Sequence, residues 1–151
     1  MTKERTVMGD YSIKAQFEAG CPPLAMKRWL DNPQGIAGWW SDKVDGAAGT
    51  VGDTFHVTFP TSPVVFDLEV IAVSDTAVEW HIPQSPPWWQ GTTIRFELSG
   101  SEGDKTRLLF THRGFDPDDP IIQVITPAWI RFLDNLVAVA ESGKANPAVV
   151  N

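Results

Sequence analysis

Tryptophan and histidine are the side chains of this sequence whose chemistry points most directly to a site. The 151 residues include seven tryptophans, and the pairs Trp39-Trp40 and Trp88-Trp89 stand in turn-rich or proline-rich stretches. An indole ring needs apolar surroundings and one acceptor for its N–H group. Paired rings outside periodic segments therefore suggest the walls and mouth of an apolar pocket, and for Trp40, Trp88 and Trp89 an alternative of comparable weight is rim packing that seals the sheet edge against the short helices. Trp29 and Trp80 are interpreted as packing residues.

His112 is the histidine of greatest chemical interest, because strand alternation places it on the apolar side of its segment with Phe110. At the mouth of a cavity, a histidine can hydrogen-bond a ligand carbonyl or transfer a proton near neutral pH. The alternative is a histidine that fixes a strand-to-helix corner through backbone hydrogen bonds. We favour this alternative, because no acid or nucleophile accompanies His112 as a catalytic set would require. His56 and His81 have the opposite phase and are expected at the surface.

The sequence offers no pattern for a metal or nucleotide. Zinc needs three or four clustered ligands, and one cysteine with three scattered histidines provides no such spacing. The glycine-rich stretch 46–52 lacks the endings of a phosphate loop or a Rossmann turn. Prolines interrupt the aspartates of 116–119, which are interpreted as helix caps. We therefore expect no metal and no cofactor, and we assign no catalytic residue.

Charge and composition exclude several classes of partner. The net charge is −7, and residues 31–104 hold eleven acidic side chains against only Lys43 and Arg95. Such a surface repels phosphate backbones, so nucleic-acid binding is not expected. No run reaches the roughly eighteen apolar residues of a membrane span, residues 1–10 lack a signal-peptide core, and the lone Cys21 cannot form an internal disulfide. We expect a cytoplasmic location.

Six segments alternate apolar and polar residues, as half-buried strands do. They cover residues 11–17, 55–59, 66–70, 78–82, 94–98 and 108–112. Short connections between them favour an antiparallel meander with one covered face. Two short helices are predicted after the first strand, from Pro23 to Leu30 and from Pro33 to Trp40.

The C-terminal segment is predicted to cover the sheet, because apolar residues recur there at helical spacing. They are Trp129, Phe132, Leu133, Leu136, Val137 and Ala140. A short helical stretch at 120–125 precedes this helix, either separate from it or continuous through a kink at Pro127. Gly143 should end the helix. The whole chain, 1–151, is expected to form a single domain with a core over 11–143 and flexible N- and C-terminal ends.

This order of elements resembles the START-like or SRPBCC helix-grip fold. In that α+β fold an antiparallel sheet, here of about six strands, curls around the C-terminal helix and leaves a cavity. Four segments are similar to the bacterial branch related to activators of heat-shock-protein ATPase: GWWSDKVDGAAGTVGDTF at 38–55, WWQGTTIRFEL at 88–98, TRLLFTHRGF at 106–115 and PAWIRFLDNL at 127–136. The resemblance covers residues 12–143. It implies a fold and a cavity, while the function of such a fold depends on its site.

Binding of a small hydrophobic or amphipathic ligand between sheet and helix is the function these features favour. The candidate cavity residues are Trp40, Phe55, Trp80, Trp88, Trp89, Phe96, Phe110, His112, Trp129, Phe132 and Leu133. One alternative is a chaperone-modulating interaction domain, although the chaperone activators usually carry an additional domain. The other is a cofactor-free cyclase or hydrolase that uses His112 with Arg95 or Asp116, for which a second catalytic group at suitable spacing is lacking.

Overall fold

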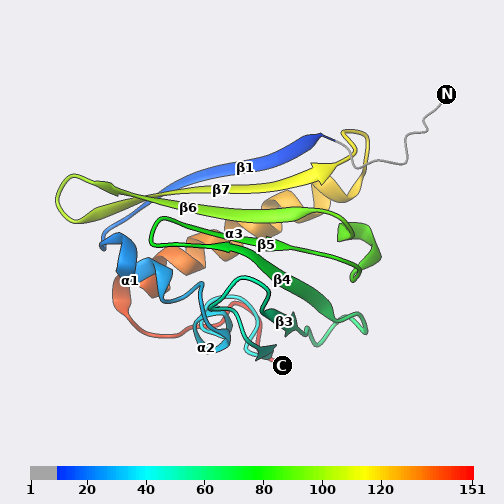
Figure 1. Cartoon of the computed structure of the whole chain (residues 1–151), viewed down its shortest axis with the longest axis horizontal. Coiled ribbons are helices and arrows are strands. Elements are labelled where there is room, and N and C mark those ends of the chain that lie inside the picture. Colours follow the sequence, from blue (N-terminus) through cyan, green and yellow to red (C-terminus); the bar gives the residue numbers. More distant parts are fainter. Residues whose placement is uncertain (1–9) are drawn as a thin grey trace.

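A seven-stranded antiparallel sheet and one long helix dominate the computed structural model, which describes residues 10–151. The sheet order is β1-β7-β6-β5-β4-β3-β2. Figure 1 shows the helix α3 (Ile121–Ser142) crossing one face of this sheet. The strands are β1 (Tyr11–Ala19), β2 (Val44–Gly46), β3 (Thr54–Val57), β4 (Phe66–Val73), β5 (Ala77–His81), β6 (Thr93–Ser101) and β7 (Lys105–Phe115).

The predicted α+β helix-grip architecture is confirmed, with one strand more than the six that alternation indicated. The additional strand is β2, which pairs with β3 so that Val44 lies opposite Val57 and Gly46 opposite Phe55. Three residues are too few to show a period of two, so β2 left no recognisable pattern. Its position at one end of the sheet makes it an edge strand.

Gly46 allows β2 to approach β3 closely. Its φ of +117° lies in a region that favours glycine, and a Cβ at this position would overlap the carbonyl oxygen of Thr54. We expect Gly46→Ala to lower the free energy of unfolding by about 1–3 kcal/mol, as measured by urea denaturation. The control is Gly100→Ala, because nothing lies within 4 Å of a Cβ there. Equal losses of unfolding free energy for Gly46→Ala and Gly100→Ala would show that the close approach of β2 to β3 does not require glycine.

Two short helices place a pair of tryptophans beneath the sheet. They are α1 (Pro23–Lys27) and α2 (Pro33–Ala37), each beginning with a proline, and both end about three residues earlier than predicted. The Asn32 side chain caps α2 by accepting the Gly35 N–H at 2.7 Å. Immediately after α2, the Trp39 indole N–H donates to the Trp29 carbonyl at 2.7 Å, which fixes the chain where it enters the core.

The helix α3 is continuous through Pro127, so the two predicted helical stretches form one element. It ends at Gly143, whose φ of 73° is left-handed and whose N–H bonds the Val139 carbonyl at 2.8 Å, as predicted. Its buried residues are Ile125, Trp129, Leu133, Leu136, Val139 and Ala140.

The length and composition of α3 would also suit a membrane span, although no such run was recognised in the sequence. One helix of this kind is weak evidence, because core helices of soluble folds have the same composition. Here the apolar stripe of α3 belongs to the same hydrophobic core as the sheet. We therefore interpret α3 as a core helix.

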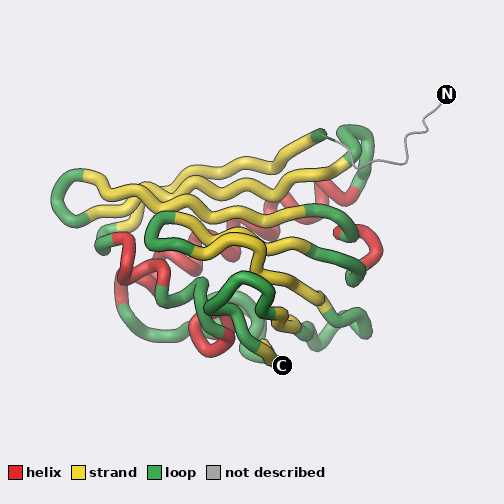
Figure 2. The backbone as a smooth tube through the Cα atoms, viewed as in Figure 1, coloured by secondary structure: helices red, strands yellow, loops and turns green. Residues whose placement is uncertain are grey.

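The C-terminal segment 144–151, which was expected to be flexible, is hydrogen-bonded to the chain that follows α2. Asn146 and Val149 donate their N–H groups to the carbonyls of Gly38 and Trp40, at 2.8 and 2.9 Å, and Asp42 donates to the Val149 carbonyl at 2.9 Å. Figure 2 shows this segment as a loop that passes beside the short helix α2. The other end expected to be flexible, the N-terminus, lies outside the described residues except for Asp10.

Candidate functional site

The ring of Trp40 is the centre of an aromatic cluster between the sheet and α3. It stacks on Trp39 and Trp80 with ring centroids 5.8 and 6.4 Å apart, and it lies 5.4 Å from Trp129. All four rings are almost completely buried. The protein's own side chains therefore fill the deep space between sheet and helix where a ligand cavity was expected.

The eleven candidate cavity residues divide into two groups. Six are fully buried in the core and do not line the pocket described next: Phe55, Trp80, Phe96, Phe110, His112 and Leu133. The other five line one pocket of about 260 Å³ beside the N-terminal half of α3: Trp40, Trp88, Trp89, Trp129 and Phe132. We call this the aromatic pocket. Trp40 and the pair Trp88-Trp89 thus approach one opening, as the sequence suggested.

Residues that the sequence did not suggest complete the aromatic pocket. They are Phe59, Thr61, Ser62 and Phe66 from the β3–β4 region, and Ile121, Val124, Ile125 and Ala128 from the start of α3. Within residues 10–151 the lining contains no ionisable side chain, and Thr61 and Ser62 supply its hydroxyl groups. Among them, Val124 is apolar yet remains 64% exposed on α3.

A single turn of 3-10 helix, η1 (Pro87–Trp89), sends its two tryptophans in different directions. Trp88 remains 41% exposed at the mouth of the pocket, whereas Trp89 is buried. Trp89 stacks on Trp129 with centroids 5.9 Å apart and meets Phe66 edge-on at 4.9 Å. The exposed lining residues thus include one aromatic ring from η1, Trp88, and one aliphatic side chain from α3, Val124.

His112 ties the pocket-lining Trp129 to the sheet through a chain of hydrogen bonds. The Trp129 indole N–H donates to His112 Nδ1 at 3.0 Å. This assigns the imidazole proton to Nε2, which donates to Thr92 Oγ1 at 2.8 Å, and the Thr92 hydroxyl donates to the Trp89 carbonyl at 2.7 Å. Both ring nitrogens are satisfied within the chain.

Burial makes His112 a structural residue. Its exposed fraction is 0%, and desolvation lowers its pKa from 6.5 to about 3, so the ring is neutral at physiological pH. A neutral, fully bonded imidazole is poorly suited to proton transfer. The structural role favoured from the sequence holds, but the partners of His112 are side chains rather than backbone groups.

A family model described as "Activator of Hsp90 ATPase homolog 1-like protein" matches residues 17–141, from β1 to the last turn of α3. The chain belongs to this family. The START-like, SRPBCC-type resemblance is thereby confirmed. Among curated proteins, none matches the sequence.

Solved structures show the same fold as this family member. The Aha1 dimer from Colwellia psychrerythraea has a TM-score of 0.79 and 26% identity, covering 89% of this chain and 99% of that one. Protein MLL2253 from Mesorhizobium loti has a TM-score of 0.74 and 23% identity, covering 87% and 98%. DynU16, a protein of the dynemicin biosynthetic locus, has a TM-score of 0.73 and 20% identity, covering 94% and 51%. The last two likenesses concern the fold alone.

The enzyme alternative required Arg95 or Asp116 to act with His112, and in this family member neither residue lies beside His112. Arg95 bonds Glu79 and Glu97 at 2.8 and 2.9 Å on the outer face of the sheet, the opposite side from His112. Asp116 is exposed and accepts the Asp118 N–H at 3.0 Å. Neither group can act with His112 on one substrate.

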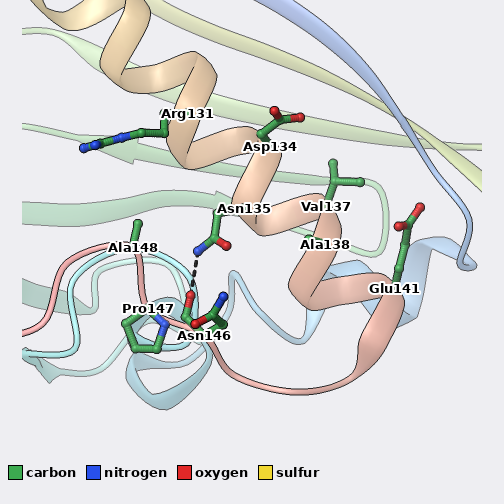
Figure 3. A pocket seen from close by; sticks show the side chains of 9 residues that line it. All are labelled: Arg131, Asp134, Asn135, Val137, Ala138, Glu141, Asn146, Pro147 and Ala148. Carbon is green, nitrogen blue, oxygen red and sulfur yellow. Dashed lines mark hydrogen bonds between the residues drawn. The ribbon is translucent and has the colours of Figure 1, made fainter.

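A second depression, of about 700 Å³, lies between α3 and the C-terminal segment (Figure 3). Its lining combines charged side chains, those of Arg131, Asp134 and Glu141, with apolar residues. Figure 3 shows Asn135 bonded to the Asn146 carbonyl, at 2.7 Å, across this depression. An apolar molecule fits the chemistry of the aromatic pocket better than that of this depression.

Proposed function

We propose that this protein binds a small, neutral, largely apolar molecule in the aromatic pocket. The observation that carries the proposal is the lining: seven tryptophan or phenylalanine rings come close to one opening together with the aliphatic start of α3, and no side chain of the lining within residues 10–151 is ionisable. Ligand pockets generally combine such apolar walls with very few polar groups. The aromatic pocket has that composition, with two hydroxyls available for orientation.

The electrostatic environment favours a neutral ligand. Moving an unpaired charge into apolar surroundings is costly, and the part of the pocket lining formed by residues 10–151 provides no cation for a carboxylate. The net charge of −7 adds a general repulsion of anions. The ligand is therefore expected to carry a ketone, ether, ester or hydroxyl group rather than an acid.

The size and surface of the pocket also limit the ligand. About 260 Å³ lies below the usual range of roughly 300–1,000 Å³ for ligand sites, which suits one or two rings rather than a long acyl chain. The indole N–H atoms of Trp40 and Trp89 are shielded from solvent and have no hydrogen-bond partner within residues 10–151. A ligand in this pocket thus meets the ring surfaces, and its affinity comes from apolar burial at about 25 cal/mol per Å².

Two nearly isosteric probes test this proposal: 4-phenylbutan-2-one, which is neutral, and 3-phenylpropanoate, which is an anion of similar shape. Calorimetry and tryptophan fluorescence should show saturable binding of the ketone, at least about tenfold tighter than binding of the carboxylate. Trp88→Ala should weaken ketone binding about tenfold, because an aromatic wall at the mouth is lost.

The matched control is Leu24→Ala, which truncates an exposed apolar residue that does not line the pocket. Its affinity for the ketone should equal that of the wild type. Failure of both probes to bind would contradict ligand binding itself. Tighter binding of the carboxylate would contradict only the neutral character of the ligand.

A chaperone partner is the second candidate function, and the family description together with the exposed Trp88 and Val124 favours it. Buried aromatic anchors and their surrounding apolar rim are typical of protein interfaces. An ATPase assay on an Hsp90-type chaperone, with and without the protein, separates this function from ligand binding. A cytoplasmic location belongs to both proposals.

A further inference from the structure

The outer edge of β1 has no strand partner within residues 10–151. All nine residues of β1 pair with β7 on the other side, and Figure 1 shows β1 at the rim of the sheet. Strands are usually five or six residues long. A longer edge presents many unpaired N–H and C=O groups, which proteins either block or use for pairing with another chain.

The exposed face of β1 carries charges of opposite sign four residues apart, Lys14 and Glu18, with Gln16 between them. An edge lysine usually discourages strand pairing, because its charge meets no counter-charge. When two copies of β1 pair antiparallel with Gln16 opposite Gln16, however, Lys14 of each copy stands opposite Glu18 of the other. Opposite charges at directly opposed positions stabilise a strand pair. The strand is thus self-complementary in charge.

Glu18 remains available for such a contact. Its neighbour within the chain is Lys105, at 3.9 Å, and both side chains are about half exposed. An exposed pair at this distance contributes little and is easily exchanged.

The helix-facing side of β1 is complementary in the same register. Ala15 and Phe17 are only half-buried although they pack against the core. Pairing about Gln16 sets Ala15 of one copy opposite Phe17 of the other. A second copy would therefore cover apolar surface that the chain leaves partly exposed, in addition to forming backbone hydrogen bonds.

The helix α3 extends this apolar surface beside the edge. It packs against β1, and near the end of the strand Glu141 accepts the Gly20 N–H at 2.6 Å. Figure 3 shows Val137 and Glu141 on the side of α3 along which β1 passes. Val137 is half-buried, and Ile130, about two turns earlier, is exposed. Two copies related by a two-fold axis would bring these helix positions together.

We propose that two copies of this chain associate by antiparallel pairing of their β1 strands about a two-fold axis at Gln16, so that their sheets become continuous. Such an interface is isologous, because each copy contributes the same residues. The proposal specifies an interface on the opposite side of the fold from β2 and does not depend on the aromatic pocket.

Charge reversal tests the register. Sedimentation equilibrium of the full chain should show a concentration-dependent dimer. K14E and E18K should each weaken dimerisation at least about tenfold, because like charges then face each other at two places. The double variant K14E/E18K should return to within about threefold of the wild type, since the opposite pairs are restored. K144E, the same charge change in the C-terminal segment, should have no effect.

Cysteine crosslinking tests the axis independently. Opposed residues of an antiparallel pair have Cα atoms about 4.5–5.5 Å apart, within the range of a disulfide. Gln16→Cys should therefore form a covalent dimer on mild oxidation, whereas Lys14→Cys, which faces Glu18, should not. The native Cys21 is buried. A wild type that stays monomeric, a dimer indifferent to charge reversal, or equal crosslinking at both positions would overturn the proposal.

Discussion

Replacing Trp40 by alanine is expected to lower the free energy of unfolding by about 3–5 kcal/mol, a large part of the stability of a domain this size. The ring is buried and packs against Trp39, which follows α2, and against the tryptophans of β5, η1 and α3. Its removal therefore opens a cavity that no single neighbour can fill. Urea denaturation monitored by far-UV circular dichroism measures this loss without relying on tryptophan emission.

Trp88→Ala is the matched control for Trp40→Ala, because it removes an identical side chain from an exposed position. Its cost should stay below about 1 kcal/mol. Trp40→Phe should lie between the two, since a smaller ring retains part of the packing. Similar losses of unfolding free energy for Trp40→Ala and Trp88→Ala would show that the buried ring of Trp40 stabilises the fold no more than an exposed tryptophan does.

Acidification is expected to remove about 3 kcal/mol of stability through His112 alone between pH 7.5 and 4.5. The pKa of His112 is about 3 in the folded protein, against about 6.5 for an unperturbed histidine. Below pH 6.5 the unfolded chain therefore binds a proton that the folded protein excludes. The contribution of His112 to the free energy of unfolding is fully present above pH 6.5. It falls by about 1.4 kcal/mol per pH unit as the pH decreases toward 3.

Comparison of variants isolates this effect from the titration of carboxylates. His112→Gln removes the titrating group, so the difference in unfolding free energy between wild type and His112→Gln should shrink by about 3 kcal/mol over that pH range. Thr92→Val disturbs the same hydrogen-bond chain but keeps the histidine. Its stability should therefore decrease in parallel with that of the wild type. A constant difference for His112→Gln would contradict a strongly depressed pKa.

The sequence predicted which face of each strand is buried but not whether the space beyond it is filled. Alternation correctly turned Phe96, Phe110 and His112 toward the helix. Whether those side chains border a cavity depends on how Trp40 and Trp80 stack beneath them, and no local pattern specifies a ring-to-ring distance. For this reason the deeper cavity candidates became core residues.

Features formed by backbone contacts were also hidden from the sequence. The C-terminal segment is held by hydrogen bonds between main-chain groups of Val149 and of Trp40 and Asp42, which any residue type can make. The helix wall of the pocket was missed for another reason. The helical pattern was strongest after Pro127, so the apolar residues Ile121 and Val124 were not assigned to the ligand site.

Pro127 interrupts the backbone hydrogen bonds of α3 beside the aromatic pocket. Proline has no N–H group, so the bond that would join it to the Gln123 carbonyl is missing, while Thr126 Oγ1 bonds the Ile122 carbonyl at 2.6 Å on the near side of the gap. Ile121 and Val124 stand before this gap, whereas Trp129 stands after it, anchored to His112. At this point the wall of the pocket depends on side-chain packing, chiefly that of the buried Ile125, for a connection that the backbone does not make.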